Sequence, residues 1–218
     1  MADGFPTFGG APAAAELAKF PRNDLGNALR LVRLVGGTIN EAGDVDHTNA
    51  VLLYLRKRGW IAFNGRFWDL EAGEEEARRW THRVAAGLMA QGPKADGGAF
   101  CSVKEWAAFM DRTGSSGASA GMLQAAIPYL SVDLSAFDRD PLSINVRNGT
   151  LKFRRESGAW GVRLQTPHDP ADRITRFADV AYDPVAPRPN FDALVRFCQP
   201  REDMSTFLKA LFGYAATG

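Results

Sequence analysis

Two Asn-Gly pairs, each set between β-favouring runs, constrain the fold of this chain more than any other feature of its sequence. The first pair, Asn64-Gly65, separates residues 60–63 from residues 66–68, and both flanking runs contain Trp and Phe. Asn and Gly tolerate a positive φ at both central positions of a type I′ turn, so the sequence predicts a β-hairpin with that turn. The alternation of side chains along the two runs indicates that one face of this hairpin is buried.

The second pair, Asn148-Gly149, lies within a longer β-favouring region. Residues 142–146 and 150–154 flank the string Arg147-Asn148-Gly149, which predicts a second hairpin. Residues 160–164 supply a third strand, so the region is expected to form a meander. Residues 173–182 are a candidate for one further strand.

Helical periodicity and capping residues indicate where the remaining elements lie. Asn23 or Asp24 offers an N-cap, and Ser102 with Glu105 has the spacing of a capping box. The predicted helices cover residues 23–32, 48–57, 74–89, a segment that begins at residue 102, 118–130, 191–198 and 203–214. The predicted fold class is α+β, with helices, two Asn-Gly β-hairpins that form an antiparallel sheet, and a C-terminal helical pair.

Composition along the chain predicts its division into segments. Residues 1–21 are rich in Gly, Pro and Ala and are expected to form a flexible leader. Residues 22–183 are expected to form the α+β domain, and the prolines that follow predict a stiff linker. Residues 190–218 are expected to form the C-terminal helices.

Charge and composition limit the classes of function. Lys and Arg number 26 against 25 Asp and Glu, so a DNA contact has to come from local clusters rather than from bulk charge. Cys101 and Cys198 lie far apart and are expected to be unpaired thiols in a reducing cytosol. His47, His82 and His168 lack partners at metal-ligand spacing, so no metal site is predicted. No apolar run is long enough for a membrane span or a secretion signal.

One pair of acids is a candidate for catalysis. Asp44 and Asp46 are spaced i, i+2, which on a strand places both carboxylates on one face, where such a pair can hold two Mg²⁺ ions for nucleotidyl transfer. The residues before Asp44 do not form an apolar strand, so a polar turn with Asp46 or Thr48 as a cap is favoured. Asp140, which precedes Pro141, is expected to form an Asx turn rather than a metal site. The sequence has no G-x-x-x-x-G-K-[ST] string and therefore no Walker phosphate loop.

Clusters of basic residues are the better candidates for a functional surface. Lys and Arg on a β-ribbon can follow a phosphate backbone, and exposed aromatic side chains can stack on bases. The tryptophans, Trp160 among them, are expected in the core instead. The candidates for DNA contact are first Arg147, Lys152, Arg154 and Arg155, and second Arg56, Lys57 and Arg58.

Several strings in this order along the chain resemble one family. They are Asn23-Asp24-Leu25-Gly26-Asn27-Ala28, residues 59–68, residues 137–151, Pro167-His168-Asp169-Pro170, Thr175, Tyr182-Asp183-Pro184 with Ala186, and residues 211–218. Together they resemble the N-terminal domain that precedes the helicase in phage, plasmid and poxvirus-like primase–helicases of superfamily 3. In physical terms the strings supply turns and hairpin core, and Asn145 and Asn148 are expected to make side-chain to backbone hydrogen bonds.

The resemblance implies a replication accessory domain without catalytic residues or a cofactor of its own. It would support ring assembly, guide DNA and couple to an ATP-driven helicase motor that lies beyond Gly218. The resemblance further implies that the parent protein uses ATP and Mg²⁺ and forms a homo-oligomer, expected to be a hexamer. Its implied partners are single-stranded DNA, the helicase domain of the same polypeptide and a primase module; no membrane is implied.

Two alternatives stay open from the sequence. One is a minimal primase or nucleotidyltransferase that uses Asp44 and Asp46. The other is a module that binds only proteins. Template-directed primer synthesis separates the first from the accessory domain, and ring formation without affinity for DNA is the signature of the second.

Overall fold

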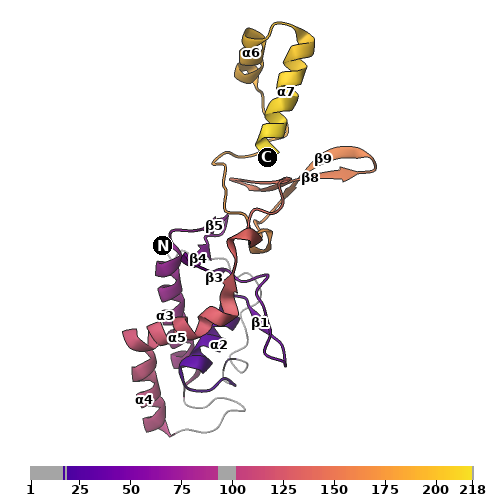
Figure 1. Cartoon of the computed structure of the whole chain (residues 1–218). Coiled ribbons are helices and arrows are strands. Elements are labelled where there is room, and N and C mark those ends of the chain that lie inside the picture. Colours follow the sequence, from indigo (N-terminus) through magenta and orange to yellow (C-terminus); the bar gives the residue numbers. More distant parts are fainter. Residues whose placement is uncertain (1–16, 18, 93–101, 218) are drawn as a thin grey trace. The chain divides into compact units, whose positions relative to one another are not determined.

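The computed structural model describes residues 17, 19–92 and 102–217, and its helices and strands are labelled in Figure 1. The chain forms two compact units. The first comprises Met1–Phe137 with Asp169–Thr175, and the second comprises Asp138–His168 with Arg176–Gly218. The division falls inside residues 22–183, which the sequence analysis treated as one domain, so the two Asn-Gly pairs belong to different units.

The first unit is built on a four-stranded sheet in the order β5-β4-β3-β6. Its strands are β3 (Leu52–Leu55), β4 (Gly59–Phe63), β5 (Trp68–Asp69) and β6 (Ser131–Val132), and β3 pairs with β6 in parallel. The helix predicted over residues 48–57 is therefore wrong. The apolar run in this segment also fits helical spacing, but three of the four residues of β3 are buried, as in a central strand covered on both faces.

The first Asn-Gly pair turns the chain between β4 and β5, as the sequence predicts, but not in a type I′ turn. Four residues, 64–67, connect Phe63 to its partner Trp68. Gly65 has a positive φ and Asn64 does not; instead Asn64 Oδ1 accepts hydrogen bonds from the amides of Arg66 and Phe67 at 3.0 and 3.1 Å. The Asn side chain therefore closes a wider turn than the one expected.

Helices complete the first unit close to their predicted positions. They are α2 (Asp24–Leu34), α3 (Gly73–Gln91), α4 (Val103–Thr113) and α5 (Ser116–Leu130). Asn23 caps α2, and both hydrogen bonds of the Ser102–Glu105 capping box are present. A short hairpin of β1 (Thr38–Ile39) with β2 (Val45–Asp46) follows α2, and a 3-10 turn, η1 (Leu134–Ala136), follows β6.

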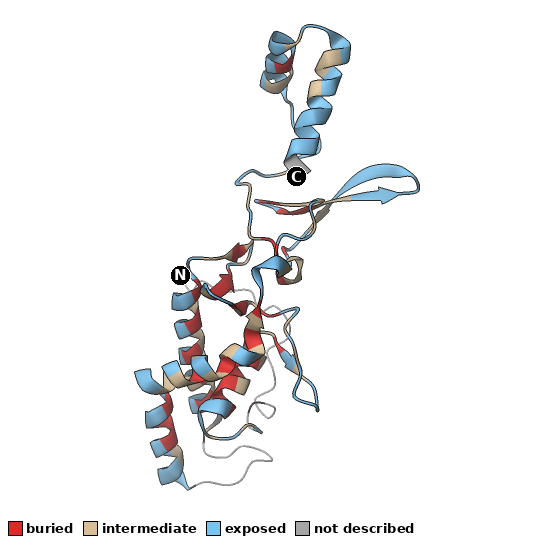
Figure 2. Cartoon of the chain, in the orientation of Figure 1, coloured by how far each residue is buried: buried red, intermediate tan, exposed pale blue. Residues whose placement is uncertain are grey.

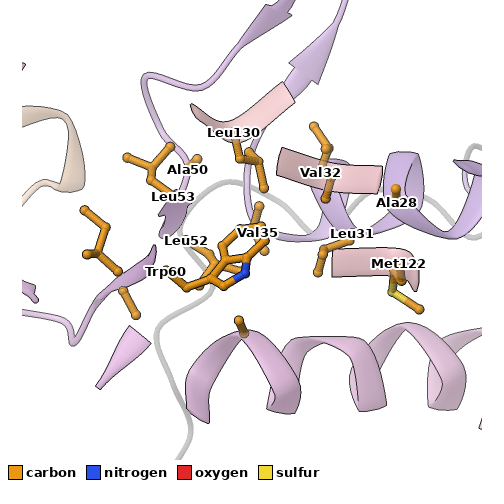
Figure 3. Close-up of a cluster of buried hydrophobic side chains, with 14 of the residues drawn as sticks. Ala28, Leu31, Val32, Val35, Ala50, Leu52, Leu53, Trp60, Met122 and Leu130 are labelled. Atoms are coloured by element: carbon orange, nitrogen blue, oxygen red, sulfur yellow. The ribbon is translucent and has the colours of Figure 1, made fainter. Parts of the chain in front are cut away.

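A continuous apolar core joins these elements. Helix α2 packs on α5, and α3 packs on β4. Figure 3 shows side chains of α2, β3 and α5 gathered in this core, among them Leu31, Leu52, Met122 and Leu130, all fully buried. In Figure 2 the buried residues follow the inward sides of these helices and the strands of the sheet.

One glycine marks a close contact that the core requires. At Gly73, the first residue of α3, an added Cβ would lie 1.9 Å from the carbonyl oxygen of Trp60. Gly87, in the same helix, has no atom within 4 Å of such a Cβ. Only the glycine at the start of the helix is therefore needed to bring α3 against β4.

Arg30 anchors the end of the expected leader. Its guanidinium donates hydrogen bonds to the carbonyl oxygens of Leu17, Phe20 and Pro21 at 2.5–3.0 Å. Burial, followed by repulsion from Arg22, lowers the pKa of Arg30 to about 10. The flexible leader was predicted for residues 1–21, of which 1–16 and 18 lie outside the described residues; residues 17 and 20–21 are held by Arg30.

The segment Asp169–Thr175 returns to the first unit and covers Trp68. The Trp68 indole donates to the Pro170 carbonyl at 2.9 Å, and the Trp68 amide donates to the Ile174 carbonyl at 2.9 Å. Arg173 has a left-handed backbone (φ 52) and lies over the rings of Trp68 and Phe137. It donates to the His47 carbonyl at 2.6 Å, and burial lowers its pKa to about 10.

The second unit contains a three-stranded antiparallel meander, β7 (Ser143–Val146), β8 (Gly149–Glu156) and β9 (Ala159–Gln165). The hairpin and the third strand predicted here are confirmed. The two positive-φ residues of a type I′ turn are found at Ser157-Gly158, between β8 and β9, and not at the Asn-Gly pair. Of the candidate strand at 173–182, only an isolated bridge between Ala178 and Val146 forms.

The C-terminal helical pair is confirmed as α6 (Pro189–Cys198) and α7 (Glu202–Thr217). Val195 is buried between the helices, the rings of Phe191 and Phe212 meet edge to face at 5.8 Å, and Lys209 binds Asp192 at 2.6 Å. The fold class is α+β as predicted, although the two Asn-Gly pairs lie in separate sheets rather than in one. None of the described helices combines the length and the apolar content of a membrane span.

Candidate nucleic-acid interface

The ribbon formed by β8 and β9, residues 149–165, carries three of the seven basic residues that the sequence singled out: Lys152, Arg154 and Arg155. We call it the arm. Its strands pair in register over seven positions, from Thr150 opposite Gln165 to Glu156 opposite Ala159. The half nearest the Ser157-Gly158 turn is exposed on both strands (Figure 2). Because opposed residues of an antiparallel pair share a face, the register sorts the side chains of the arm onto two surfaces.

One surface of the arm is basic. Lys152 is opposite Arg163, and Arg154 is opposite Gly161, so three cations lie on this side. Arg154 is held by Asp140 at 2.6 Å and donates to its neighbour's carbonyl at 2.8 Å. Arg163 is exposed and forms no ion pair within the part of the chain that the structure describes. The arm holds four basic residues and one acid, whereas the whole chain has a net charge of +1.

The opposite surface of the arm is aromatic and apolar. Arg155 is opposite Trp160, and Phe153 is opposite Val162. The side chain of Trp160 is 65% exposed, which contradicts its expected place in the core. The other tryptophans are fully or partly buried in the first unit, as predicted. Trp160 is exposed because it lies on a two-stranded ribbon beyond the reach of the third strand, β7.

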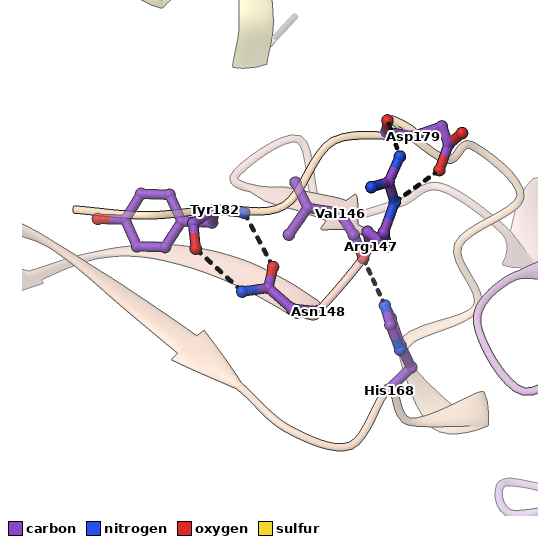
Figure 4. A network of polar contacts seen from close by, with 6 residues as sticks. All are labelled: Val146, Arg147, Asn148, His168, Asp179 and Tyr182. Atoms are coloured by element: carbon purple, nitrogen blue, oxygen red, sulfur yellow. Dashed lines mark hydrogen bonds and ion pairs between the residues drawn. The ribbon is translucent and has the colours of Figure 1, made fainter. Parts of the chain in front are cut away.

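The base of the arm is held by polar contacts to the extended segment that follows it (Figure 4). The Asn148 amide group exchanges two hydrogen bonds of 2.9 Å with the main chain of Tyr182, as expected for this residue. The Arg147 guanidinium donates to the carboxylate and to the carbonyl oxygen of Asp179, both at 3.0 Å. His168 donates through Nε2 to the Val146 carbonyl at 2.8 Å. Arg147 therefore stabilises the base of the arm. This role makes Arg147 a weaker candidate for DNA contact than the other basic residues.

The inner end of the meander has a second polar network. The Thr150 hydroxyl donates to Asn145 Oδ1 at 2.7 Å, and both side chains are buried. Asp140 forms the predicted Asx turn by accepting from the Leu142 amide at 3.0 Å. Partial burial opposes ionisation of Asp140, but hydrogen bonds from Ser143 and Arg154 outweigh it and hold the pKa of this carboxyl below its usual value.

The second basic cluster lies in the first unit. Arg56, Lys57 and Arg58 form the three-residue turn between β3 and β4, and all three are exposed. Lys57 has a positive φ of 70°, and Arg56 lies 3.6 Å from Asp133. The turn thus presents three adjacent cations, one of which is balanced by an acid.

Asp44 and Asp46, the candidate catalytic acids, are engaged in local turns. Asp44 is hydrogen-bonded to Asn40. Asp46 accepts hydrogen bonds from the amide and the hydroxyl of Thr48 at 2.9 and 2.6 Å. These bonds from Thr48 lower the pKa of Asp46. Over residues 17, 19–92 and 102–217, no three His, Cys, Asp or Glu side chains group to hold a metal ion. The polar turn expected at this position is confirmed, although a strand pair and not a helix adjoins it.

Neither a role for Arg163 nor the exposure of Trp160 was predicted from the sequence. Both lie on the strand predicted at 160–164, but which residues they oppose depends on where the chain turns. The Ser157-Gly158 dipeptide is a turn signal of the same kind as Asn-Gly. Centring the β8–β9 turn on it would have placed Arg163 opposite Lys152.

The helical pair presents a further exposed surface. Large apolar side chains of both helices are exposed: Leu194, Phe197, Phe207, Leu211, Phe212 and Tyr214. Phe197 is the most exposed of them at 87%. Large apolar side chains exposed in this number on two short helices are typical of surfaces that contact another protein. Cys198 is a free, exposed thiol in α6, whereas Cys101 lies outside the described residues.

A protein-family model described as "D5 N terminal like" matches residues 44–200 of the chain. The match includes the four-stranded sheet of the first unit, the meander of the second, and α6. Residues 23–28 and 211–218, which also contributed to the resemblance, lie outside it. No curated protein sequence matches the chain.

Proposed function

Because the chain belongs to the D5 N terminal like family, the N-terminal domains of D5-like primase–helicases that act in DNA replication, we propose that it guides single-stranded DNA for such a helicase. The arm is the observation that carries this proposal. It places Lys152, Arg154 and Arg163 together on one exposed surface of a chain that is almost neutral overall. A local cluster of this kind attracts phosphates without making the whole protein basic.

The chemistry proposed for this chain is binding and not catalysis. Asp44 and Asp46 are engaged in local turns, and the described residues bring no third acid to them. We therefore assign ATP and Mg²⁺ to the helicase part of such a protein. The basic turn at residues 56–58 is the second candidate for phosphate contact.

Fluorescence anisotropy of a labelled oligothymidylate with the full chain, measured over a range of salt concentrations, tests the proposal. The double variant Lys152→Ala/Arg163→Ala should weaken binding about tenfold and flatten the salt dependence, since each lost phosphate contact reduces the slope of log K against log salt by about 0.7 on single strands. Lys104→Ala/Arg78→Ala removes the same charge from exposed helix positions and should leave both quantities nearly unchanged.

Equal losses in the two double variants would show that bulk charge, and not the arm, attracts the DNA. Binding without any salt dependence would remove phosphate contacts from the account altogether. Either result rejects the basic surface of the arm as the DNA-binding element.

We also propose that the helical pair supports assembly of the ring by contacting a neighbouring copy of the chain. Its exposed apolar side chains support this part of the proposal. Light scattering over a range of concentrations should show an oligomer that Phe197→Ser weakens. Val185→Ser, at a linker position that is 84% exposed, is the matched control and should have no effect. A chain that stays monomeric at every concentration contradicts this role.

A further inference from the structure

The aromatic surface of the arm has no role in phosphate binding. Trp160 and Val162 lie on it well exposed, with Phe153 half-buried between the tip and the base. Exposing a tryptophan to water is unfavourable, since removing an aromatic side chain from water lowers the free energy of the folded chain. Among the residues that the structure describes, no ring or cation is stacked on Trp160.

Arg155 lies directly across the ribbon from Trp160, on the same surface. It is exposed, and its Nε donates to the Gly158 carbonyl at 3.2 Å, which holds the guanidinium near the turn. An indole and a guanidinium side by side offer two flat groups of the kind on which nucleic-acid bases stack.

We propose that Trp160, with Arg155 beside it, stacks on an unpaired base, and that this contact makes the arm select single-stranded over double-stranded DNA. The inference rests on the proposed function, because it assumes that the arm binds DNA. It adds a second type of contact: phosphates on the basic surface, bases on the aromatic one.

The charge of the arm argues for a nucleic-acid base as the occupant rather than for another protein. The aromatic surface is only one ribbon in width, and it has cations on its own side (Arg155) and on its reverse side (Lys152, Arg163). A strand that passes over the edge of the ribbon, with its phosphates drawn to the cations of both sides, brings a base within reach of the indole. In a duplex each base is already stacked on its neighbours, so its faces are not available to Trp160.

The test compares one ligand with unstacked bases, one without bases and one whose bases are already stacked in a duplex. An oligothymidylate, an abasic oligonucleotide of equal length and a duplex of equal length are titrated with the full chain. We expect the oligothymidylate to bind at least about fivefold more tightly than the abasic strand, as one stacked base provides. Trp160→Ala should abolish that difference and leave the salt slope unchanged, while Trp160→Phe should keep most of it.

Lys152→Ala/Arg163→Ala is the opposite control, because it should weaken binding to the thymidylate and the abasic strand by the same factor. Trp160 and Arg163 are exposed and Lys152 is half-buried, so none of these variants is expected to unfold the chain, and circular dichroism checks this.

The outcomes separate the two proposals. Salt-dependent but equal binding of thymidylate and abasic strands overturns the stacking inference and leaves DNA guidance standing. No binding of any ligand overturns both. A Trp160→Ala variant that binds DNA normally but changes its oligomeric state shows that the aromatic surface contacts protein, and this too overturns the inference.

Discussion

The two units of the chain are stabilised in different ways. The first has a continuous apolar core in which side chains from helices and strands interlock. In the second, the buried apolar side chains among the described residues are Val146, Leu151 and Val195, and hydrogen bonds between side chains and main chain hold the meander. The comparison teaches that the arm and the helical pair lie where packing is sparse, which leaves their side chains available for partners.

The largest effect should come from one substitution made in both environments. Trp68→Ala removes a fully buried ring that packs against Phe63 and Phe137, and should destabilise the first unit by about 3–5 kcal/mol. Trp160→Ala removes an exposed ring and should change the free energy of unfolding by less than about 0.5 kcal/mol. Urea titrations of both variants measure the difference; similar losses would mean that the arm is packed after all.

The close contact at the start of α3 should give the next largest effect. Gly73→Ala forces a methyl group against the Trp60 carbonyl and should destabilise the chain by about 2 kcal/mol. Gly87→Ala, in open space on the same helix, should stabilise it by about 0.5–1 kcal/mol through helix propensity. Thermal unfolding followed by circular dichroism measures both, and two changes of the same sign contradict this reading of the helix.

A smaller effect is expected from the polar network at the base of the arm. Asn148→Ala removes both hydrogen bonds to the main chain of Tyr182 and should lower the free energy of unfolding by about 1 kcal/mol. The loss is small because each hydrogen bond in the folded chain replaces a hydrogen bond to water in the unfolded chain. The amide of Tyr182 should then exchange with solvent faster, as measured by hydrogen exchange. Unchanged exchange at this amide would show that the segment 176–188 is held by other contacts.

The smallest effect concerns pH. The folded-state pKa of Asp140 lies below its ordinary value of 3.8, so its contribution to stability is present above 3.8 and is lost as the pH falls through the folded-state pKa. Since the side chain is partly exposed, the change should stay below about 1 kcal/mol. Urea titrations on both sides of pH 3.8 should show a loss that Asp140→Asn no longer shows; an equal loss in the variant assigns it to other acids.

Local signals in the sequence were sufficient for most of the helices and for the meander. The Ser102–Glu105 capping box and the Asn23 cap lie where expected, because a cap depends only on residues within one turn. The β3 strand was mistaken for a helix because its run of apolar residues fits both periods. Its partners decide the outcome, and the parallel pairing with β6 joins residues that are far apart in the chain.

The candidate site was predicted only in part for a similar reason. The basic residues of β8 are visible in the sequence, but the side chains they oppose depend on where the ribbon turns. The hairpin at Arg147-Asn148-Gly149, between β7 and β8, was predicted, but no turn was predicted at Ser157-Gly158, so the pairing of Lys152 with Arg163 and of Arg155 with Trp160 was missed. The role of Arg147 at the base of the arm depends on Asp179, which no local pattern connects to it.

The central claim is that the arm of the second unit is where DNA binds. Hydrogen exchange of the full chain, with and without a saturating oligothymidylate, tests it most directly. We expect amide exchange to slow over residues 149–165 more than anywhere else in the described chain. Saturated binding with unchanged exchange in the arm, and slower exchange confined to the first unit, would contradict the claim.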